Sequence, residues 1–88
     1  MSFSTKVLAR DRECPCGAPA TEAHHIYPKA DYPEFRNIKE NGIGLCTRCH
    51  QAIYGIEEDM IEVYLYLRPQ QARFMGIALQ QLHEARSR

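Results

Sequence analysis

The clearest hydrophobic pattern lies in the C-terminal third of the chain. Apolar residues recur there at spacings of three and four in two runs, first Met60, Val63, Tyr64 and Leu67, then Met75, Ala78, Leu79 and Leu82. This spacing places the apolar side chains on one face of a helix, and Pro69 ends the first run. The pattern predicts one helix that starts in the acidic residues 57–59 and a second over about 69–85, with the Gln and Arg side chains of the second turned away from its apolar face.

Shorter elements are predicted before this helical region. Residues 3–12 suit a short helix or strand, and residues 21–27 have strand-like length before Pro28. The apolar run 43–45 is expected to pair back on that strand across an irregular loop. Thr47 is a good N-cap for a helix over about 48–54 that stops at Gly55. The elements together predict a small α+β fold with C-terminal helices.

Length and composition indicate one small domain. The chain has 88 residues, of which 44% are hydrophobic, so its core is modest and a bound metal would help to stabilise it. No apolar run reaches membrane-spanning length, and residues 1–6 lack an apolar secretory stretch. We therefore expect a cytoplasmic protein, whose thiols are reduced and available for a metal.

The overall charge argues against a large static nucleic-acid footprint but allows transient contact. The 11 basic and 11 acidic side chains cancel. Their distribution is uneven, because the central third is locally basic and the acidic residues follow it. Lys29 and Arg48 are the two basic residues that we select as candidates for contact with phosphate.

Four cysteines form two tight pairs, Cys14 with Cys16 and Cys46 with Cys49. Two short pairs joined by a long connection suit one tetrahedral zinc ion, because each pair fills two coordination positions from a single turn of chain. Disulfides or free thiols are the alternatives, and a reducing compartment disfavours the disulfides. The first pair has one intervening residue rather than two, which narrows the distance that its sulfurs can span.

Three histidines lie beside these pairs, at His24, His25 and His50. Adjacent residues of a strand point to opposite faces, so His24 and His25 are expected to do different work, one reaching a metal and the other a water molecule. The simpler readings are that one histidine replaces a cysteine at the zinc or that all three lie on the surface. His83, far along the last helix, is expected to be an exposed helical residue.

The sequence resembles the HNH endonuclease family over about forty residues. The resemblance is carried by Ala23-His24-His25-Ile26-Tyr27-Pro28 and by Asn41-Gly42-Ile43-Gly44-Leu45-Cys46-Thr47-Arg48-Cys49-His50. It implies a ββα-metal core stapled by a structural zinc, in a single nuclease domain over 1–88 with its core at 13–55 and a helical extension at 56–88. It also implies a metal-dependent enzyme that hydrolyses DNA phosphodiester bonds, by nicking or by double-strand cleavage, and a homodimer is one assembly that this allows.

The resemblance also implies roles for individual residues. His24 and His50 resemble the ligands of a catalytic divalent ion, His25 the general base, and Asn41 the residue that organises the loop. Some relatives carry a further histidine where this chain has Tyr54, which leaves two imidazole ligands. Manganese, magnesium or nickel are the ions considered, and nitrogen ligands favour manganese or nickel over magnesium.

Two other readings of the same residues stay open. Cys46, Cys49 and His50 also fit the attachment pattern of a c-type haem, although that reading leaves the first cysteine pair without a role. A zinc knuckle that binds nucleic acid or protein without cutting it would share the metal site. Asn41 precedes a glycine, which is also a common turn pair.

Overall fold

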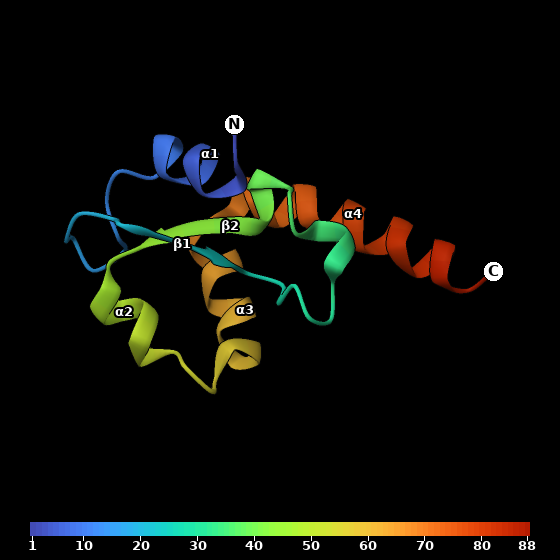
Figure 1. Ribbon diagram of the computed structural model, residues 1–88. Helices are drawn as coiled ribbons and strands as arrows, with labels where there is room; N and C mark the ends of the chain where they lie inside the picture. Colours follow the sequence, from blue (N-terminus) through green and yellow to red (C-terminus); the bar gives the residue numbers. More distant parts are fainter.

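The computed structural model describes residues 1–88 and confirms the predicted small α+β fold, with a two-stranded hairpin packed on helices. The elements in chain order are α1 (Phe3–Arg10), β1 (Glu22–His25), the short 3-10 helices η1 (Pro33–Phe35) and η2 (Lys39–Asn41), β2 (Gly42–Leu45), α2 (Thr47–Ala52), α3 (Glu57–Leu67) and α4 (Pro69–Arg86). Helix α1 covers one face of the hairpin, α2 and α3 lie on the other side, and α4 extends well past it (Figure 1). None of the helices combines the length and the apolar character that a membrane crossing needs.

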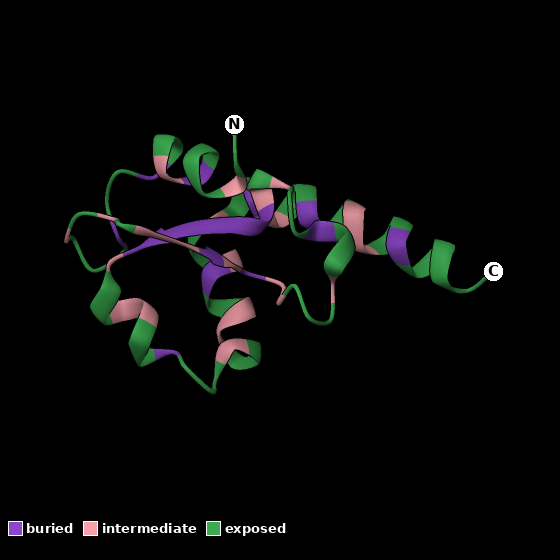
Figure 2. Ribbon diagram, viewed as in Figure 1, coloured by how far each residue is buried: buried purple, intermediate pink, exposed green.

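The hairpin is antiparallel and short. Glu22 lies opposite Leu45, and His25 lies opposite Gly42. Strand β1 is shorter than the predicted range of 21–27, because the Asn41 side chain takes over the Tyr27 backbone N–H at 2.8 Å. Strand β2 is buried along its whole length, whereas most of β1 is only half-buried (Figure 2). Since β1 has no other strand partner, its outer edge is the open edge of the sheet.

Two apolar clusters hold the helices in place. The first lies between the hairpin and helices α2 and α3, and consists of Cys14, Ile26, Ile43, Leu45, Ile53 and Tyr64. The second joins the loop between the strands to α4 through Phe35, Met75 and Leu82, with Ala78 and Leu79 packed against it. The stripe expected on the last helix is therefore confirmed.

The stripe expected on α3 is partly wrong. Val63 and Leu67 are 44% and 43% exposed, whereas Tyr64 is buried. The buried face of this helix is instead completed by Ile61 and Leu65, which pack against the first cluster. The expectation that all Gln side chains of α4 face away is also wrong, because Gln71 is buried and donates hydrogen bonds to the carbonyls of Glu40 and Gly42 at 2.8 and 2.9 Å.

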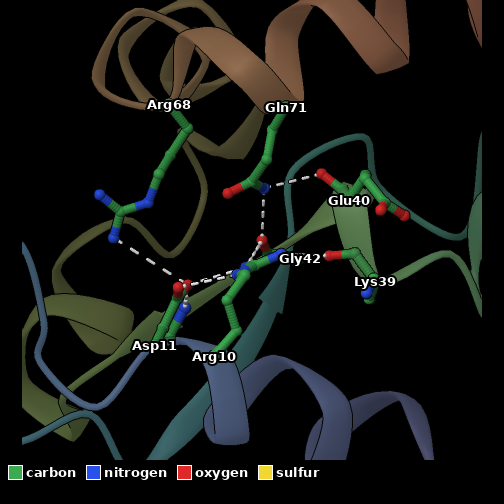
Figure 3. A network of polar contacts seen from close by, with 8 residues as sticks. Arg10, Asp11, Lys39, Glu40, Gly42, Arg68 and Gln71 are labelled. Atoms are coloured by element: carbon green, nitrogen blue, oxygen red, sulfur yellow. Dashed lines mark hydrogen bonds and ion pairs between the residues drawn. The ribbon is translucent and has the colours of Figure 1, made fainter.

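The outer edge of β2 is covered by side chains instead of a third strand (Figure 3). Asp11 accepts a hydrogen bond from the Gly44 N–H at 2.9 Å, while Arg10 and Gln71 donate to the Gly42 carbonyl at 2.6 and 2.9 Å. Satisfying these backbone groups protects the edge from pairing with another chain. Burial alone would raise the pKa of Asp11, but hydrogen bonds from Arg10 and Gly44 and the charges of Arg10 and Arg68 outweigh burial and hold that pKa below its ordinary value.

We expect Asp11→Asn to destabilise the domain by about 1.5–3 kcal/mol, because Arg10 and the Gly44 N–H lose their buried, charged acceptor. A carboxyl with a lowered folded-state pKa stabilises the fold at every pH above its unfolded pKa, which is near 3.8, and loses this effect only as the pH falls through the folded value. The stability difference should therefore stay constant from pH 8 to pH 5 in chemical denaturation. Glu13→Gln, which removes the same charge from an exposed side chain, should change little. A difference that already shrinks between pH 6 and pH 5 would contradict the lowered pKa.

Candidate active site and metal centres

The four cysteines meet where the turn at residues 14–18 lies beside the start of α2. The first pair sits in a tight knuckle, where the Cys14 N–H donates to the Ala18 carbonyl at 2.7 Å and the Gly17 N–H donates to the Cys14 carbonyl at 2.8 Å. Gly17 has a φ of 97°, a backbone conformation that favours glycine. This reversal lets the short first pair aim both sulfurs at the second pair.

The sulfur positions fit a tetrahedral zinc ion. The four Sγ atoms all lie within 4.8 Å of one another, and those of Cys16 and Cys46 are 3.7 Å apart. Zinc–sulfur bonds of about 2.3 Å in a tetrahedron require sulfur separations of about 3.8 Å. Hydrogen bonds with Cys16, Cys46 and Cys14 raise the pKa of Cys49 to about 12, which shows how closely the four sulfurs are gathered. The cluster is thus consistent with a structural zinc, and it gives Cys14 and Cys16 the role that the haem reading lacks.

The second pair also starts helix α2, and the N-cap is one residue earlier than predicted. Cys46, not Thr47, is the N-cap, and its Sγ accepts a hydrogen bond from the Cys49 N–H at 3.4 Å. The Thr47 hydroxyl is used elsewhere, because it donates to Glu22 Oε2 at 2.6 Å. Cysteine is not among the usual N-cap residues, so capping preferences did not indicate that the Cys46 sulfur would both join the four-cysteine cluster and cap a helix. The helix also ends earlier than expected, at Ala52.

His24 and His50 approach each other on the side of the hairpin that faces α2 and α3. Their ring centroids are 5.2 Å apart with an edge-to-face angle of 69°. His24 is buried, and its Nε2 has no hydrogen-bond partner. Burial lowers the pKa of His24 to about 4, an effect that the neighbouring His50 and His25 reinforce. The imidazole is therefore neutral at pH 7 and has a lone pair for a metal ion.

Glu22 completes this group, and it was not selected from the sequence. Its Oε1 accepts a hydrogen bond from His50 Nδ1 at 2.6 Å, and the hydrogen bonds from Thr47 and His50 hold the pKa of Glu22 below its ordinary value. A carboxylate that holds one imidazole nitrogen fixes the tautomer and leaves the other nitrogen for a metal. The signal in the sequence was the strand period of two, which puts Glu22 and His24 on the same face.

A small cavity of about 200 Å³ opens beside His50. Its lining consists of Glu22, His50, Gln51, Ile53, Tyr54 and Glu57. Tyr54, which stands where some relatives carry another histidine, is 91% exposed and adds no ligand to His24 and His50. Lys29 and Arg48 are exposed at two separate places, in the loop after β1 and in the first turn of α2, and neither lines this cavity. His83 is exposed on α4, as expected.

His25 lies on the opposite face of the hairpin, toward α1. Its Nε2 is 2.9 Å from the carbonyl oxygen of Arg36. A carbonyl can only accept, so Nε2 carries the proton and Nδ1 keeps its lone pair in the neutral ring. The two adjacent histidines thus point to different sides of β1, which agrees with strand geometry.

Asn41 links two segments of chain from a fully buried position. Its Oδ1 accepts from the Tyr27 N–H, and its Nδ2 donates to the carbonyls of Tyr27 and Phe35 at 3.1 and 3.4 Å. Its own carbonyl accepts from the Ile26 N–H at 2.8 Å. Asn41 therefore does more than occupy a turn, because it fastens the chain that follows β1 to the loop that carries Arg36.

The hairpin, the helix that follows it and the cysteine cluster define a ββα-type domain with four cysteines placed to hold one metal ion. Residues 12–54 match the family model described as HNH endonuclease, so the chain carries an HNH endonuclease family-model domain over this segment. The proteins that this family model describes are nucleases, whose substrates are nucleic acids. No curated protein and no solved structure matches the chain.

Proposed function

We propose that this protein is a metal-dependent endonuclease that hydrolyses DNA phosphodiester bonds. The observation that carries the proposal is the buried, unpartnered Nε2 of His24 beside the ring of His50. A buried polar atom without a partner is costly, and a bound cation would remove that cost. The match of residues 12–54 to the HNH endonuclease family model supports the same reading.

His24 and His50 would hold the divalent ion. Glu22 would orient His50 through Nδ1, which leaves Nε2 as the nitrogen that faces the ion. A divalent ion bound there supplies charge stabilisation to a phosphate oxygen and to the leaving oxygen. Two imidazoles are few ligands, so the site should exchange its ion readily, and manganese or nickel should serve better than magnesium, which prefers oxygen.

His25 would act as the general base. Its Nε2 is committed to the Arg36 carbonyl, so the Nδ1 lone pair of the neutral ring is left to take a proton from water. The outer edge of β1 is open, so a phosphodiester that lies along this edge can meet groups from both faces of the strand. Asn41 would support the base by fixing the loop whose Arg36 carbonyl holds His25.

Lys29 and Arg48 would contact backbone phosphates on either side of the cleaved bond. Both are exposed and neither has a hydrogen-bond or ion-pair partner in the protein, so both are free to bind anions. Such contacts would position the strand without reading its bases. A monomer with one such site should nick one strand at a time and, by resemblance to the family, leave 5′-phosphate and 3′-hydroxyl ends.

The test is incubation of zinc-loaded protein with supercoiled plasmid and one added divalent ion. We expect nicked circles with manganese or nickel, slower nicking with magnesium and none in EDTA. An electrophoretic shift of the plasmid without nicking under every ion would instead identify a zinc-knuckle module that binds without cutting.

A further inference from the structure

The ring of Phe3 lies flat against the imidazole of His25. The two ring centroids are 4.0 Å apart and the planes differ by 4°. Phe3 is the first residue of α1, and it precedes the matched segment 12–54 by nine positions. The ring that covers the candidate base therefore comes from outside the HNH domain match.

A glycine makes room for this ring. Gly42 lies directly opposite His25 in the hairpin, and a Cβ added there would lie 2.7 Å from Phe3 Cζ and closer still to Val7. Val7 is fully buried one helical turn after Phe3. The Phe3 ring thus lies directly against the bare backbone of β2 at Gly42, at the level of His25.

Phe3 and Arg36 restrain His25 in different ways. The Arg36 carbonyl holds one edge of the imidazole through Nε2 at 2.9 Å, but a single hydrogen bond still allows the ring to tilt. The χ2 torsion of histidine is intrinsically broad, so the tilt needs a second restraint. A flat aromatic contact supplies it, because tilting the imidazole would separate the two faces.

We propose that Phe3 is a positioning residue for the general base. Together with the Arg36 carbonyl it fixes the plane of His25, so that the Nδ1 lone pair has one direction toward the attacking water. The inference rests on the proposed role of His25. It extends the functional unit to α1, with Gly42 as the residue that lets the helix approach.

The kinetic test compares three variants in the plasmid assay. Phe3→Leu keeps an apolar side chain over Gly42 but removes the flat ring, and we expect kcat to fall about tenfold with KM for DNA unchanged, since misplaced catalytic groups lose rate rather than binding. Phe3→Tyr keeps the ring and should restore the wild-type rate. Val7→Ala loosens the same helix without touching His25, so at a temperature well below its melting point it should cleave within about twofold of wild type.

A second readout follows the contact without catalysis. In NMR spectra of zinc-loaded protein the ring protons of His25 should be shifted upfield by the Phe3 ring in wild type and in Val7→Ala, and this shift should vanish in Phe3→Leu. The inference is overturned if wild type shows no such shift, or if Phe3→Leu loses the shift and still cleaves at the wild-type rate. It is also overturned if Val7→Ala slows cleavage as much as Phe3→Leu does, which would reduce Phe3 to a stability role.

The two proposals fail in different ways. If wild-type protein does not cleave DNA, or if His25→Ala cleaves normally, both fail, and the NMR shift would then record a purely structural contact. If wild type is active, His25→Ala is inactive and Phe3→Leu matches wild type, only the positioning role fails.

Discussion

His25→Ala is expected to lower the cleavage rate by about 10²–10⁴-fold, the range that a positioned general base contributes. The reason is the free lone pair on Nδ1 of a ring whose Nε2 is committed to the Arg36 carbonyl. Alanine leaves nothing in place of this proton acceptor, whereas DNA binding and zinc content should stay as in wild type. The measurement is kcat in the plasmid assay at saturating manganese.

Raising the manganese concentration distinguishes the loss of a metal ligand from the loss of the general base. Loss of one imidazole in His24→Ala or His50→Ala should weaken metal binding, so part of the lost activity should return as manganese is raised. No concentration of manganese should rescue His25→Ala. His83→Ala, in an exposed histidine far along α4, is the control for a contaminating nuclease and should be fully active. Recovery of His25→Ala at high manganese would mean that His25 is a ligand and that the base must be sought elsewhere.

The parts of the fold that follow local rules could be predicted from the sequence. The apolar face of α4 is an example, because Met75 and Leu82 repeat at helical spacing and both are buried. The pairing of the two short strands followed from the apolar run 43–45 and the loop signals before it. The cysteine cluster could also be expected, since its spacing is tied directly to the coordination geometry of zinc.

The parts that depend on contacts distant in sequence could not be predicted. Nothing local marks Val63 and Leu67 as exposed, because which side of α3 is buried depends on how it packs under the hairpin. Gln71 has an ordinary helical context and is buried only because the edge of β2 needs a donor. The same holds for the site, where strand alternation separates His24 from His25 but does not reveal that Phe3 stacks on one of them.

Loss of the zinc ion is the other change for which we expect a large effect, and Cys16→Ser is its sharpest test. Cys16 is exposed, so a serine there would be harmless if the cysteines served only to fill the core, whereas Cys14 is 2% exposed and would be costly to change in any case. If all four sulfurs hold one zinc ion, Cys16→Ser should lose zinc as completely as Cys46→Ser. Serine at Cys46 would also retain an N-cap acceptor for α2, so its effect reports the loss of a ligand rather than of the cap.

The expected size follows from the contribution of zinc to folding. Structural zinc contributes about 10–16 kcal/mol in small zinc domains, which matches or exceeds the total stability of about 5–15 kcal/mol of an ordinary domain. Losing even about 4 kcal/mol would lower the melting temperature by roughly 16–32 °C, because about 1 kcal/mol corresponds to 4–8 °C at this size. Thermal unfolding followed by circular dichroism, with zinc content measured by mass spectrometry, should show both variants without zinc and largely unfolded, and a chelator should do the same to wild type. If purified wild type held no zinc, and Cys16→Ser kept the wild-type melting temperature while Cys14→Ser lost it, the cluster would be a packing feature and the zinc staple would have to be abandoned.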